Sequence, residues 1–570
     1  MGDQYNTTGA AADDDDDDNY SVQAEATRIL HERLLNDASL GLPQSFTDAA
    51  RKIRIVGDDP KPFVPTPCKM TESAAALTAL VAAAASAVAA DRYGIDYQDV
   101  EVDTDLATLF LESVLLPTVA TTPPQPFLQH PVLRAEFAKG DLHQTSKPIH
   151  QEATNVYRTR DGRWYHLHGS MDAAPTMRMV GVPEQDVTRD EAIRIYADEV
   201  AKWDAADIEA CANGDGFRQA GVTCLRPHEF FASEQGRVMG AEPLWTRREV
   251  EVPSGVVGRS CAWPEVDEEG DGDGEFKPLE GIRVIDFSRV IAAPVISKVL
   301  AVLGADVIKV TNETLPDLAI LWVDLSTGKR DANVDLKSAA GKAQFAALVE
   351  GADVLIDGYR PGVLERLGFD AERLREVNPR LVYARENCYG FKGPLARRSG
   401  WQQISDCLVG ISWLQGEFLG LDEPVVPLLP NSDYQTGLVG AAAILHALLD
   451  RTKRPGVTFD VDVSLTQYNI WYYRLGQYTE AQAAALRARN EGFHVRHYDE
   501  MQTLLVKSHA AIQKARPELF RRPEYFWRMS GKEWGLDEDI NILAPAFRFE
   551  RSKLGYKVPS GKRGRSKPEW

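Results

Sequence analysis

Alternating strand and helix signals between residues 281 and 387 constrain the fold of this 570-residue chain more than any other feature. Short β-rich apolar runs alternate there with segments whose apolar residues recur at helical spacing. Pro294 suits the first turn of one helix and Gly304 suits its end. The pattern predicts an α/β fold with an open, doubly wound parallel sheet, Rossmann-like, covered on both faces by helices. The predicted strands are residues 281–288, 306–310, 353–359 and 380–387, and the predicted helices are 293–305, 341–352 and 371–379.

Ligands of such sheets bind beyond the carboxyl ends of the strands, which here include residues 288–290, 358–360 and 388–394. Neither a GxGxxG fingerprint nor a Walker loop follows the first strand. Residues 359–400 hold nine Lys or Arg and five Asp or Glu, whereas the whole chain has 64 basic and 84 acidic side chains, a formal net charge of −20. We expect this local positive charge to hold the phosphates of a nucleotide-like ligand. The overall charge disfavours nucleic acid and membrane surfaces as partners.

Four segments in this half resemble one known family. They are residues 279–310, 326–345, 352–394 and 432–451. In this order and spacing they are similar to the large domain of class III CoA-transferases, which include formyl-CoA and carnitine CoA-transferases and α-methylacyl-CoA racemase. The similarity is continuous from Leu279 to Leu465. It implies an enzyme that moves CoA from an acyl-CoA donor to a carboxylic acid acceptor, with CoA as the substrate thioester and without a metal.

Asp433 is the catalytic residue that the resemblance implies. In the family a single aspartate opens a D-x-x-x-G helix start, which here runs from Asp433 to Gly437. That aspartate attacks the thioester to form a mixed anhydride, and returning CoA converts the anhydride into an aspartyl-CoA thioester. From the residues alone, a position before an apolar helix suits either a nucleophile at the helix N-terminus or an N-capping aspartate.

The resemblance also implies contacts with CoA. The family's turn beside the nucleotide corresponds to residues 358–362, which keep an aromatic side chain but lack the family's asparagine. Glycines in residues 390–393 would let the backbone approach the pantetheine arm, because glycine has no Cβ. The implied CoA-binding residues are Arg289, Lys329, Arg330, Tyr359, Arg360, Arg366, Gly390, Gly393 and Trp401.

Trp401 and Gln402 depart from the family pattern. Many relatives read Gly-Tyr-Asp where this chain reads Gly400-Trp401-Gln402, and the racemases carry their proton-exchanging histidine at the middle position. Tryptophan cannot act as that base, which disfavours the alternative of an acyl-CoA racemase or epimerase. The departures also keep open an alternative from another class, a noncatalytic CoA-binding or scaffold protein.

The first half of the chain contains a partial second copy of this pattern. Residues 73–106 align without a gap with residues 432–465, with nine identities in 34 positions, and Ala74 falls opposite Asp433. Residues 155–169 and the helical sequence after them resemble the family's smaller domain. We therefore expect tandem degenerate copies and a smaller α+β lid domain, folded as an internal pseudo-dimer with one complete site. In solution the protein is expected to be this pseudo-dimeric monomer or a homodimer.

The chain divides into six predicted segments. They are a disordered acidic tail (1–22), a degenerate large-domain remnant (23–150), a small domain (151–250), an acidic glycine-rich linker (251–278), a CoA-binding large domain (279–480), and a helical extension with a C-terminal tail (481–570). Six cysteines without a CxxC pair and no secretory pattern predict an intracellular, cytoplasmic protein. The alanine-rich run from Ala74 to Ala90 predicts a buried helix and not a membrane span.

Overall fold

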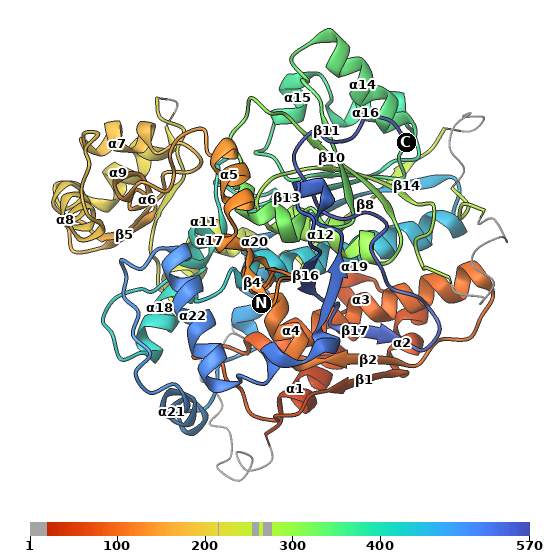
Figure 1. The fold of residues 1–570 in the computed structure, drawn as a ribbon, viewed down its shortest axis with the longest axis horizontal. Helices are drawn as coiled ribbons and strands as arrows, with labels where there is room; N and C mark the ends of the chain where they lie inside the picture. The colour runs from red at the N-terminus through yellow and green to blue at the C-terminus, as the bar shows by residue number, and fades with distance from the viewer. Residues whose placement is uncertain (1–19, 215, 254–260, 266–275) are drawn as a thin grey trace, which may run out of the picture.

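The computed structural model describes residues 20–570 except 215, 254–260 and 266–275. Its centre is a seven-stranded sheet of order β11-β10-β9-β12-β13-β14-β8 (Figure 1). The strands from β11 to β14 in this order run parallel to their neighbours, which confirms the predicted α/β fold with a parallel sheet. Their bounds are β9 (Arg283–Phe287), β10 (Asp306–Thr311), β11 (Lys329–Asn333), β12 (Val354–Asp357), β13 (Val382–Asn387) and β14 (Val457–Ser464).

Helices cover both faces of the sheet. Successive side chains along a buried strand point to opposite faces, so each strand contributes to a core on either side. Val284 packs in the core that contains α12 (Ala292–Val302) and α19 (Asn431–Lys453). Ile285, the next residue, packs in the core formed by three helices on the other face. These are α14 (Ala339–Glu350), α15 (Val363–Leu367) and α16 (Ala371–Val377). The predicted helices therefore occur in the predicted order along the chain.

The seventh strand comes from the first half of the chain. β8 (Trp245–Glu251) pairs antiparallel with β14 at the edge of the sheet, with Trp245 opposite Val463. In the predicted division of the chain, residues 245–250 fall in the small domain (151–250) and Glu251 falls in the linker (251–278), whereas in the structure the whole strand pairs with the main sheet. A strand from one half thus completes the sheet of the other.

The two halves also meet where α3 (Met70–Tyr93) packs against α19. By length and composition α3 could cross a membrane, but 94% of its most apolar window is buried inside the protein, as expected for a core helix. The aligned segments contain the same order of elements, a long helix, a strand and a second helix capped by the strand's last residue. The first set is α3, β2 (Val100–Asp103) and α4 (Thr104–Phe110), and the second is α19, β14 and α20 (Leu465–Arg474).

A hairpin module packs around a core of its own. β5 (Asn155–Arg158) and β6 (Trp164–Leu167) form the predicted antiparallel hairpin, and β7 (Gly221–Thr223) pairs with β6. Tyr157 and Tyr196 are buried at its centre. The module projects at the left of Figure 1. Its helices are α7 (Ala174–Val180), α8 (Arg189–Val200) and α9 (Ala205–Asn213).

The C-terminal segment is only partly the predicted helical extension. α21 (Glu480–Arg489) and α22 (Met501–Ala515) are helices, but strands follow them. β16 (Ile540–Leu543) pairs with β3 (Thr118–Val119), and β17 (Phe547–Phe549) pairs with β2. The chain after α22 is therefore built into the sheets of the first half.

Most of the predicted acidic tail and part of the predicted linker lie outside the described residues. Residues 20–22, at the end of the predicted tail, belong to the fold, because the Tyr20 hydroxyl donates to Glu72 and Val22 begins α1 (Val22–Arg28). Cys261 and Trp263, inside the predicted linker, pack on the fold, and Trp263 Nε1 donates to Asp91 at 2.9 Å.

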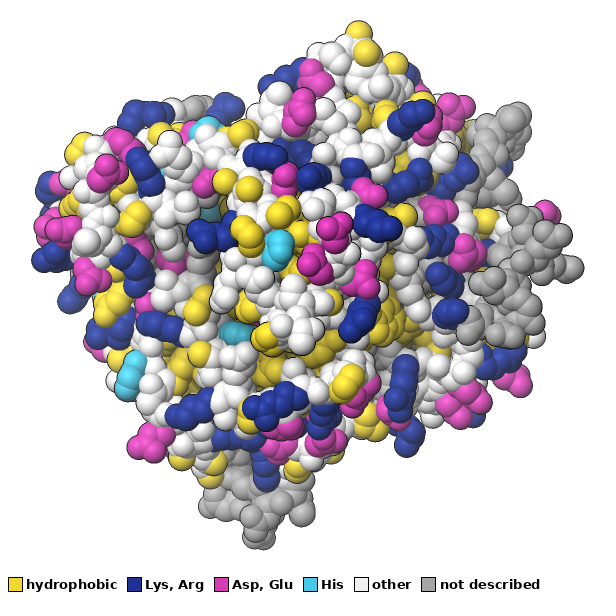
Figure 2. Space-filling view, in the orientation of Figure 1, with side chains coloured by type: hydrophobic (Ala, Val, Ile, Leu, Met, Phe, Trp, Pro, Cys, Tyr) yellow, Lys and Arg dark blue, Asp and Glu magenta, His cyan; other side chains and the backbone are white. Residues whose placement is uncertain are grey.

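Charged side chains of both signs are interspersed over the face shown in Figure 2. Many exposed cations are paired, as in Arg160 with Asp204 at 2.7 Å and Lys392 with Glu242 at 2.8 Å. Exposed pairs of this kind contribute about 0–1 kcal/mol each.

Candidate active site

Asp433 lies in the first turn of α19, and its side chain borders two adjoining pockets. The residue is 8% exposed, and within the described part of the chain its carboxyl has no hydrogen-bond partner. Burial raises the pKa of Asp433 well above its usual range, and the nearby Glu386 and Asp406 raise it further. A buried, unpartnered carboxyl open to a cavity is a candidate catalytic group.

Glu386 is a second carboxyl at this site that the sequence analysis missed. It follows the apolar part of β13, is 9% exposed, and lines the first pocket with Asp433. Burial raises the pKa of Glu386 to about 8, with a further contribution from Asp357. Its position near the carboxyl end of a parallel strand was a signal that could have identified it.

Asp406 is the third carboxyl, and it lies behind Asp433. It belongs to α17 (Gln402–Val409), and burial raises its pKa to about 7. It accepts hydrogen bonds from Gln402 Nε2 at 2.6 Å and from Ser432 Oγ at 2.9 Å. Gln402, which departs from the family pattern, is thus a buried partner of Asp406. No sequence signal identifies Asp406, because its position depends on how α17 packs against α19.

The first pocket, of about 90 Å³, contains four of the predicted CoA-binding residues, Arg289, Tyr359, Arg360 and Trp401. Tyr359 stacks on Phe287 with ring centroids 4.3 Å apart, and the Arg289 guanidinium lies 4.9 Å from the centre of the Tyr359 ring. Burial raises the pKa of Tyr359 to about 12, so its hydroxyl stays neutral. Arg289 and Arg360 therefore give this pocket a basic wall.

Arg398 also lines the first pocket, although the sequence analysis did not select it. Its Nη1 donates to Glu209 Oε1 of the hairpin module at 2.7 Å. This ion pair joins the loop before α17 to the module. The sequence signal for Arg398 was the excess of basic residues in 359–400, but this excess did not distinguish Arg398 from its neighbours.

Three predicted basic residues lie outside both pockets. Lys329 is fully buried, and its Nζ donates to Asp286 at 2.9 Å, so the two residues form an ion pair inside the sheet. Burial lowers the pKa of Lys329 to about 8. Arg330 donates to the carbonyl of Glu569 at 2.8 Å, and Arg366 is exposed on α15. The charge pattern indicated cations here but could not show which ones reach a cavity.

The predicted glycines Gly390 and Gly393 also lie outside both pockets. Each has a positive φ, and each is covered by α11 (Glu234–Gly240) of the first half. A Cβ on Gly390 would lie 2.2 Å from Met239 Cε, and one on Gly393 would lie 2.5 Å from Gln235 Oε1. The close approach that these glycines allow is therefore made by α11.

The second pocket, of about 170 Å³, brings together segments that are distant in sequence. One wall comes from residues 145–173 of the first half, another from residues 318–321, and a third from residues 500–505 around the start of α22. Trp401 and Asp433 lie on its border with the first pocket. Asp433 is thus reached from a basic pocket and from a largely apolar one.

His168 stands at this border, stacked on Trp401. Its Nδ1 accepts from the backbone N–H of Ser170 at 2.9 Å. Burial lowers the pKa of His168 well below its usual range, so the ring is neutral and this lone pair is engaged. His168 therefore does not replace the proton-exchanging histidine that the racemases carry at the position of Trp401.

Val290 is a strained residue between the two pockets. Its φ is +69°, in the left-handed region that β-branched residues rarely adopt, and the residue lines both pockets. Such a conformation costs about 1–3 kcal/mol and is found most often at functional sites. The chain is held in it where β9 ends and α12 begins.

Comparisons with known proteins agree with the sequence resemblance. A family model described as CoA-transferase family III matches residues 279–520. The acetyl-coenzyme A transferase nodX of Hypoxylon pulicicidum is 34% identical over 562 residues, covering 96% of this chain and 93% of the relative. An acyl-CoA transferase of Gibberella moniliformis is 30% identical over 453 residues, 77% of each chain.

Among solved structures, the orthorhombic form of Rv3272 from M. tuberculosis is similar over 38% of this chain and 57% of that one, at 33% identity and a TM-score of 0.31. The relative from Hypoxylon pulicicidum spans nearly the whole chain, including both halves and the C-terminal segment. The chain therefore belongs to CoA-transferase family III and is an enzyme that transfers coenzyme A.

Proposed function

We propose that the protein moves CoA between two carboxylic acids through covalent intermediates on Asp433, with the first pocket receiving the thioester end of CoA and the second holding the acyl group. The observation that carries the proposal is the position of this unpartnered, buried carboxyl on the border of both pockets. A thioester lying across that border presents its carbonyl carbon to Asp433. The acyl side then faces apolar walls, and the CoA side faces Arg289 and Arg360.

The proposed chemistry balances without any other reactant. A carboxylate oxygen of Asp433 attacks the thioester carbonyl carbon, the C–S bond breaks, and CoA leaves as a thiolate, which gives a mixed anhydride. The thiolate then attacks the Asp433 carbonyl carbon, releases the donor acid as a carboxylate and forms an aspartyl-CoA thioester. The acceptor carboxylate repeats the sequence in reverse and leaves as acyl-CoA, which restores Asp433.

The environment of Asp433 suits a nucleophile better than a helix cap. Its carboxyl has no backbone N–H partner in the described structure, as a capping aspartate would have. A poorly solvated carboxylate is a stronger nucleophile than a hydrated one, and Asp433 is largely buried. The basic wall of the first pocket also stabilises the CoA thiolate between its release from the donor and its attack on the anhydride.

The proposal includes an internal pseudo-dimer with a single complete site. β8 and the module wall of the second pocket come from the first half, whereas Asp433 comes from the second. In the alignment, Ala74 of α3 stands where Asp433 stands in α19, and Ala74 is fully buried. A carboxyl nucleophile is thus missing at the equivalent place in the first half. The hairpin module serves as the lid, and the protein acts inside the cell.

Trapping with hydroxylamine tests the proposal. The full chain is incubated with an acyl-CoA and hydroxylamine, and peptides are analysed by mass spectrometry. A hydroxamate on Asp433 is expected, with none in Asp433→Asn, whose CoA transfer is expected to fall at least about a thousandfold. Deuterium uptake at the acyl α-carbon without CoA exchange would instead indicate a racemase. The absence of both reactions would indicate a noncatalytic CoA-binding or scaffold protein.

A further inference from the structure

Segments that are distant in sequence form the walls of the second pocket, and their side chains indicate which acid can bind there. Met171 follows the hairpin, Leu318 and Ile320 follow β10, and Met501 and Leu505 belong to α22. Leu505 and Met171 are 9% and 7% exposed, so these side chains turn inward and not toward solvent.

The helix that forms one wall is held on both sides. Ser508 Oγ donates to the carbonyl of Leu428 in the second half at 3.0 Å. His509 Nδ1 lies 3.2 Å from Glu112 Oε2 in the first half. Because α22 is tied to both halves, Leu505 is a fixed wall of the pocket and not a mobile flap.

The size of the pocket limits the acyl group. A dry cavity of about 150 Å³ lined by aliphatic side chains holds a benzene molecule. The second pocket, of about 170 Å³, therefore has room for an acyl group of roughly six to eight carbons. An acetyl group would leave most of it empty, and a long fatty acyl chain would have to extend beyond its walls.

The charge in the pocket limits the acyl group further. No Lys or Arg lies among the described residues that line the second pocket. Its acidic groups are Asp433 and Glu500, and Glu500 caps α22 by accepting from the N–H of Thr503 at 2.8 Å. A second carboxylate on the substrate would be buried without a cation, which costs several kcal/mol. A dicarboxylic acid is therefore a poor occupant.

We propose that the second pocket selects the acyl group of an apolar monocarboxylic acid of about six to eight carbons, and that Leu505 sets its length. This inference rests on the proposed CoA transfer at Asp433 and adds the substrate class to it.

A symmetric exchange reaction tests the inference without knowledge of the natural pair of acids. The full chain is incubated with an acyl-CoA and the isotope-labelled free acid of the same structure, and labelled acyl-CoA is measured. Straight-chain acids from two to twelve carbons are compared with succinate and adipate. We expect kcat/KM to rise about fourfold for each added methylene up to six to eight carbons and then to fall. Succinate and adipate are expected to exchange at least about a hundredfold more slowly than hexanoate.

Variants of α22 assign the length limit to one side chain. Leu505→Ala is expected to move the optimum to longer acids and Leu505→Phe to shorter ones. If Leu505→Phe does not fold, Met501→Ala serves as the second variant, because it enlarges the same wall of the pocket as Leu505→Ala. The matched controls are Val506→Ala and Val506→Phe, because Val506 is the next residue of α22 and is 59% exposed. The controls are expected to keep the wild-type profile.

Each remaining outcome decides a separate claim. An exchange rate independent of chain length, a preference for the dicarboxylic acids, or an optimum unchanged in both Leu505 variants overturns the inference but leaves CoA transfer intact. No exchange with any acid overturns the proposed function. In that case the affinity of the same protein for acyl-CoAs still decides the inference, since it must peak at six to eight carbons and shift in the Leu505 variants.

Discussion

The imidazole of His168 lies face to face with the indole of Trp401, with ring centroids 5.4 Å apart and ring planes 3° apart. His168 follows β6 of the hairpin module, and Trp401 precedes the first residue of α17. The stack therefore joins the module to the main sheet at the border between the two pockets. A contact in this place affects both the stability of the interface and the position of bound thioester.

Trp401→Ala is expected to lower the free energy of unfolding by about 1–3 kcal/mol, since it removes a large, half-buried side chain and an aromatic stack. CoA transfer should fall about tenfold or more in kcat/KM because both pockets lose a shared wall. Steady-state kinetics and urea unfolding measure the two effects. Trp401→Phe keeps a ring against His168 and should retain most of both properties. Equal losses in the two variants would mean that the stack does not position the pocket.

Glu386→Gln is expected to move the acidic limb of the activity profile to lower pH. Glu386 raises the pKa of Asp433, and Asp433 must be ionised to attack, so removing this carboxyl makes the nucleophile available in more acidic solution. The measurement is kcat/KM between pH 5 and pH 9. The control is Glu365→Gln, since Glu365 is exposed on α15 and lines neither pocket. An unchanged limb would show that Glu386 does not act on Asp433.

The same substitution should change how stability depends on pH. The pKa of Glu386 is about 8 in the folded protein and lies near its ordinary acidic value in the unfolded chain. The folded state therefore holds the proton more tightly, and this contribution to stability is lost as pH rises from about 4.5 to about 8. Glu386→Gln should remove that loss, so the variant gains stability relative to wild type at pH 8.5 compared with pH 5. Unfolding by urea at the two pH values measures the difference, and equal differences would contradict the assigned pKa.

The sheet was predictable because its strands are buried on both faces and are short, continuous apolar runs separated by helices, as in Arg283–Phe287 and Val354–Asp357. The position of Asp433 in the first turn of a helix was predictable because the D-x-x-x-G motif places it there. Lys329 was predicted to contact CoA but lies outside both pockets, because a sequence shows the charge of a side chain but not the buried Asp286 that pairs with it.

The second pocket could not be predicted from the sequence. Its walls lie more than a hundred residues apart, and their meeting depends on the packing of the module and α22 against the main sheet. The edge strand β8 was missed for a related reason, since its pairing with β14 links segments about 200 residues apart. Local periodicity identifies elements but does not identify which distant elements meet.

Val290→Gly is expected to stabilise the fold and to impair the enzyme. Glycine adopts a φ of +69° without the strain of a β-branched residue, and the relief of about 1–3 kcal/mol is expected to exceed the sum of its extra chain entropy and the lost packing of a half-buried side chain. The activity should fall about tenfold to a hundredfold, because the loop between the pockets becomes less fixed. Thermal unfolding and steady-state kinetics measure the two effects. Val290→Ala removes most of the side chain but keeps much of the strain, so it should not show the gain in stability. A destabilised Val290→Gly would contradict the interpretation.

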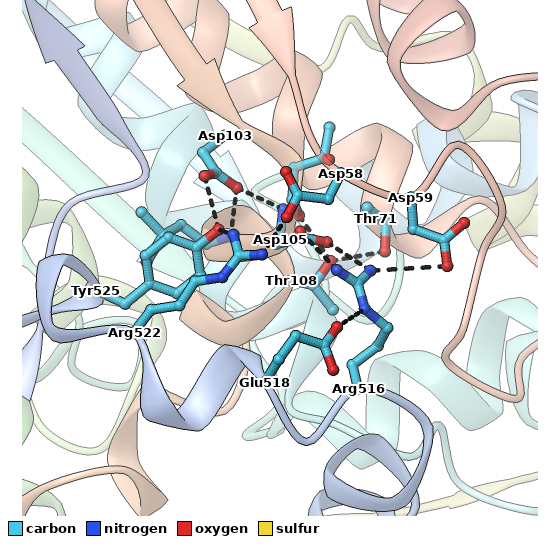
Figure 3. Close-up of polar contacts among 12 residues, drawn as sticks. Asp58, Asp59, Thr71, Asp103, Asp105, Thr108, Arg516, Glu518, Arg522 and Tyr525 are labelled. Atoms are coloured by element: carbon cyan, nitrogen blue, oxygen red, sulfur yellow. Dashed lines mark hydrogen bonds and ion pairs between the residues drawn. The ribbon is translucent and has the colours of Figure 1, made fainter.

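The C-terminal segment is fastened to the first half by a buried ion pair that should dominate its stability. Figure 3 shows Arg516, which follows α22, with both terminal nitrogens on Asp105 of α4, at 3.1 and 3.0 Å. Arg516 is 5% exposed and Asp105 is 1% exposed, so removing one partner leaves the other charge buried. Arg516→Met is therefore expected to cost about 3–5 kcal/mol, whereas replacing Arg522, which faces the exposed Asp58, by Met should cost about 1 kcal/mol or less.

Urea unfolding measures the stability of these variants, and limited proteolysis should cleave residues 516–550 faster in Arg516→Met alone. Adding Asp105→Asn to Arg516→Met should recover part of the loss, because it removes the unpaired charge. If Arg516→Met and Arg522→Met cost the same, or if the added substitution makes Arg516→Met still less stable, the buried pair does not fasten the segment.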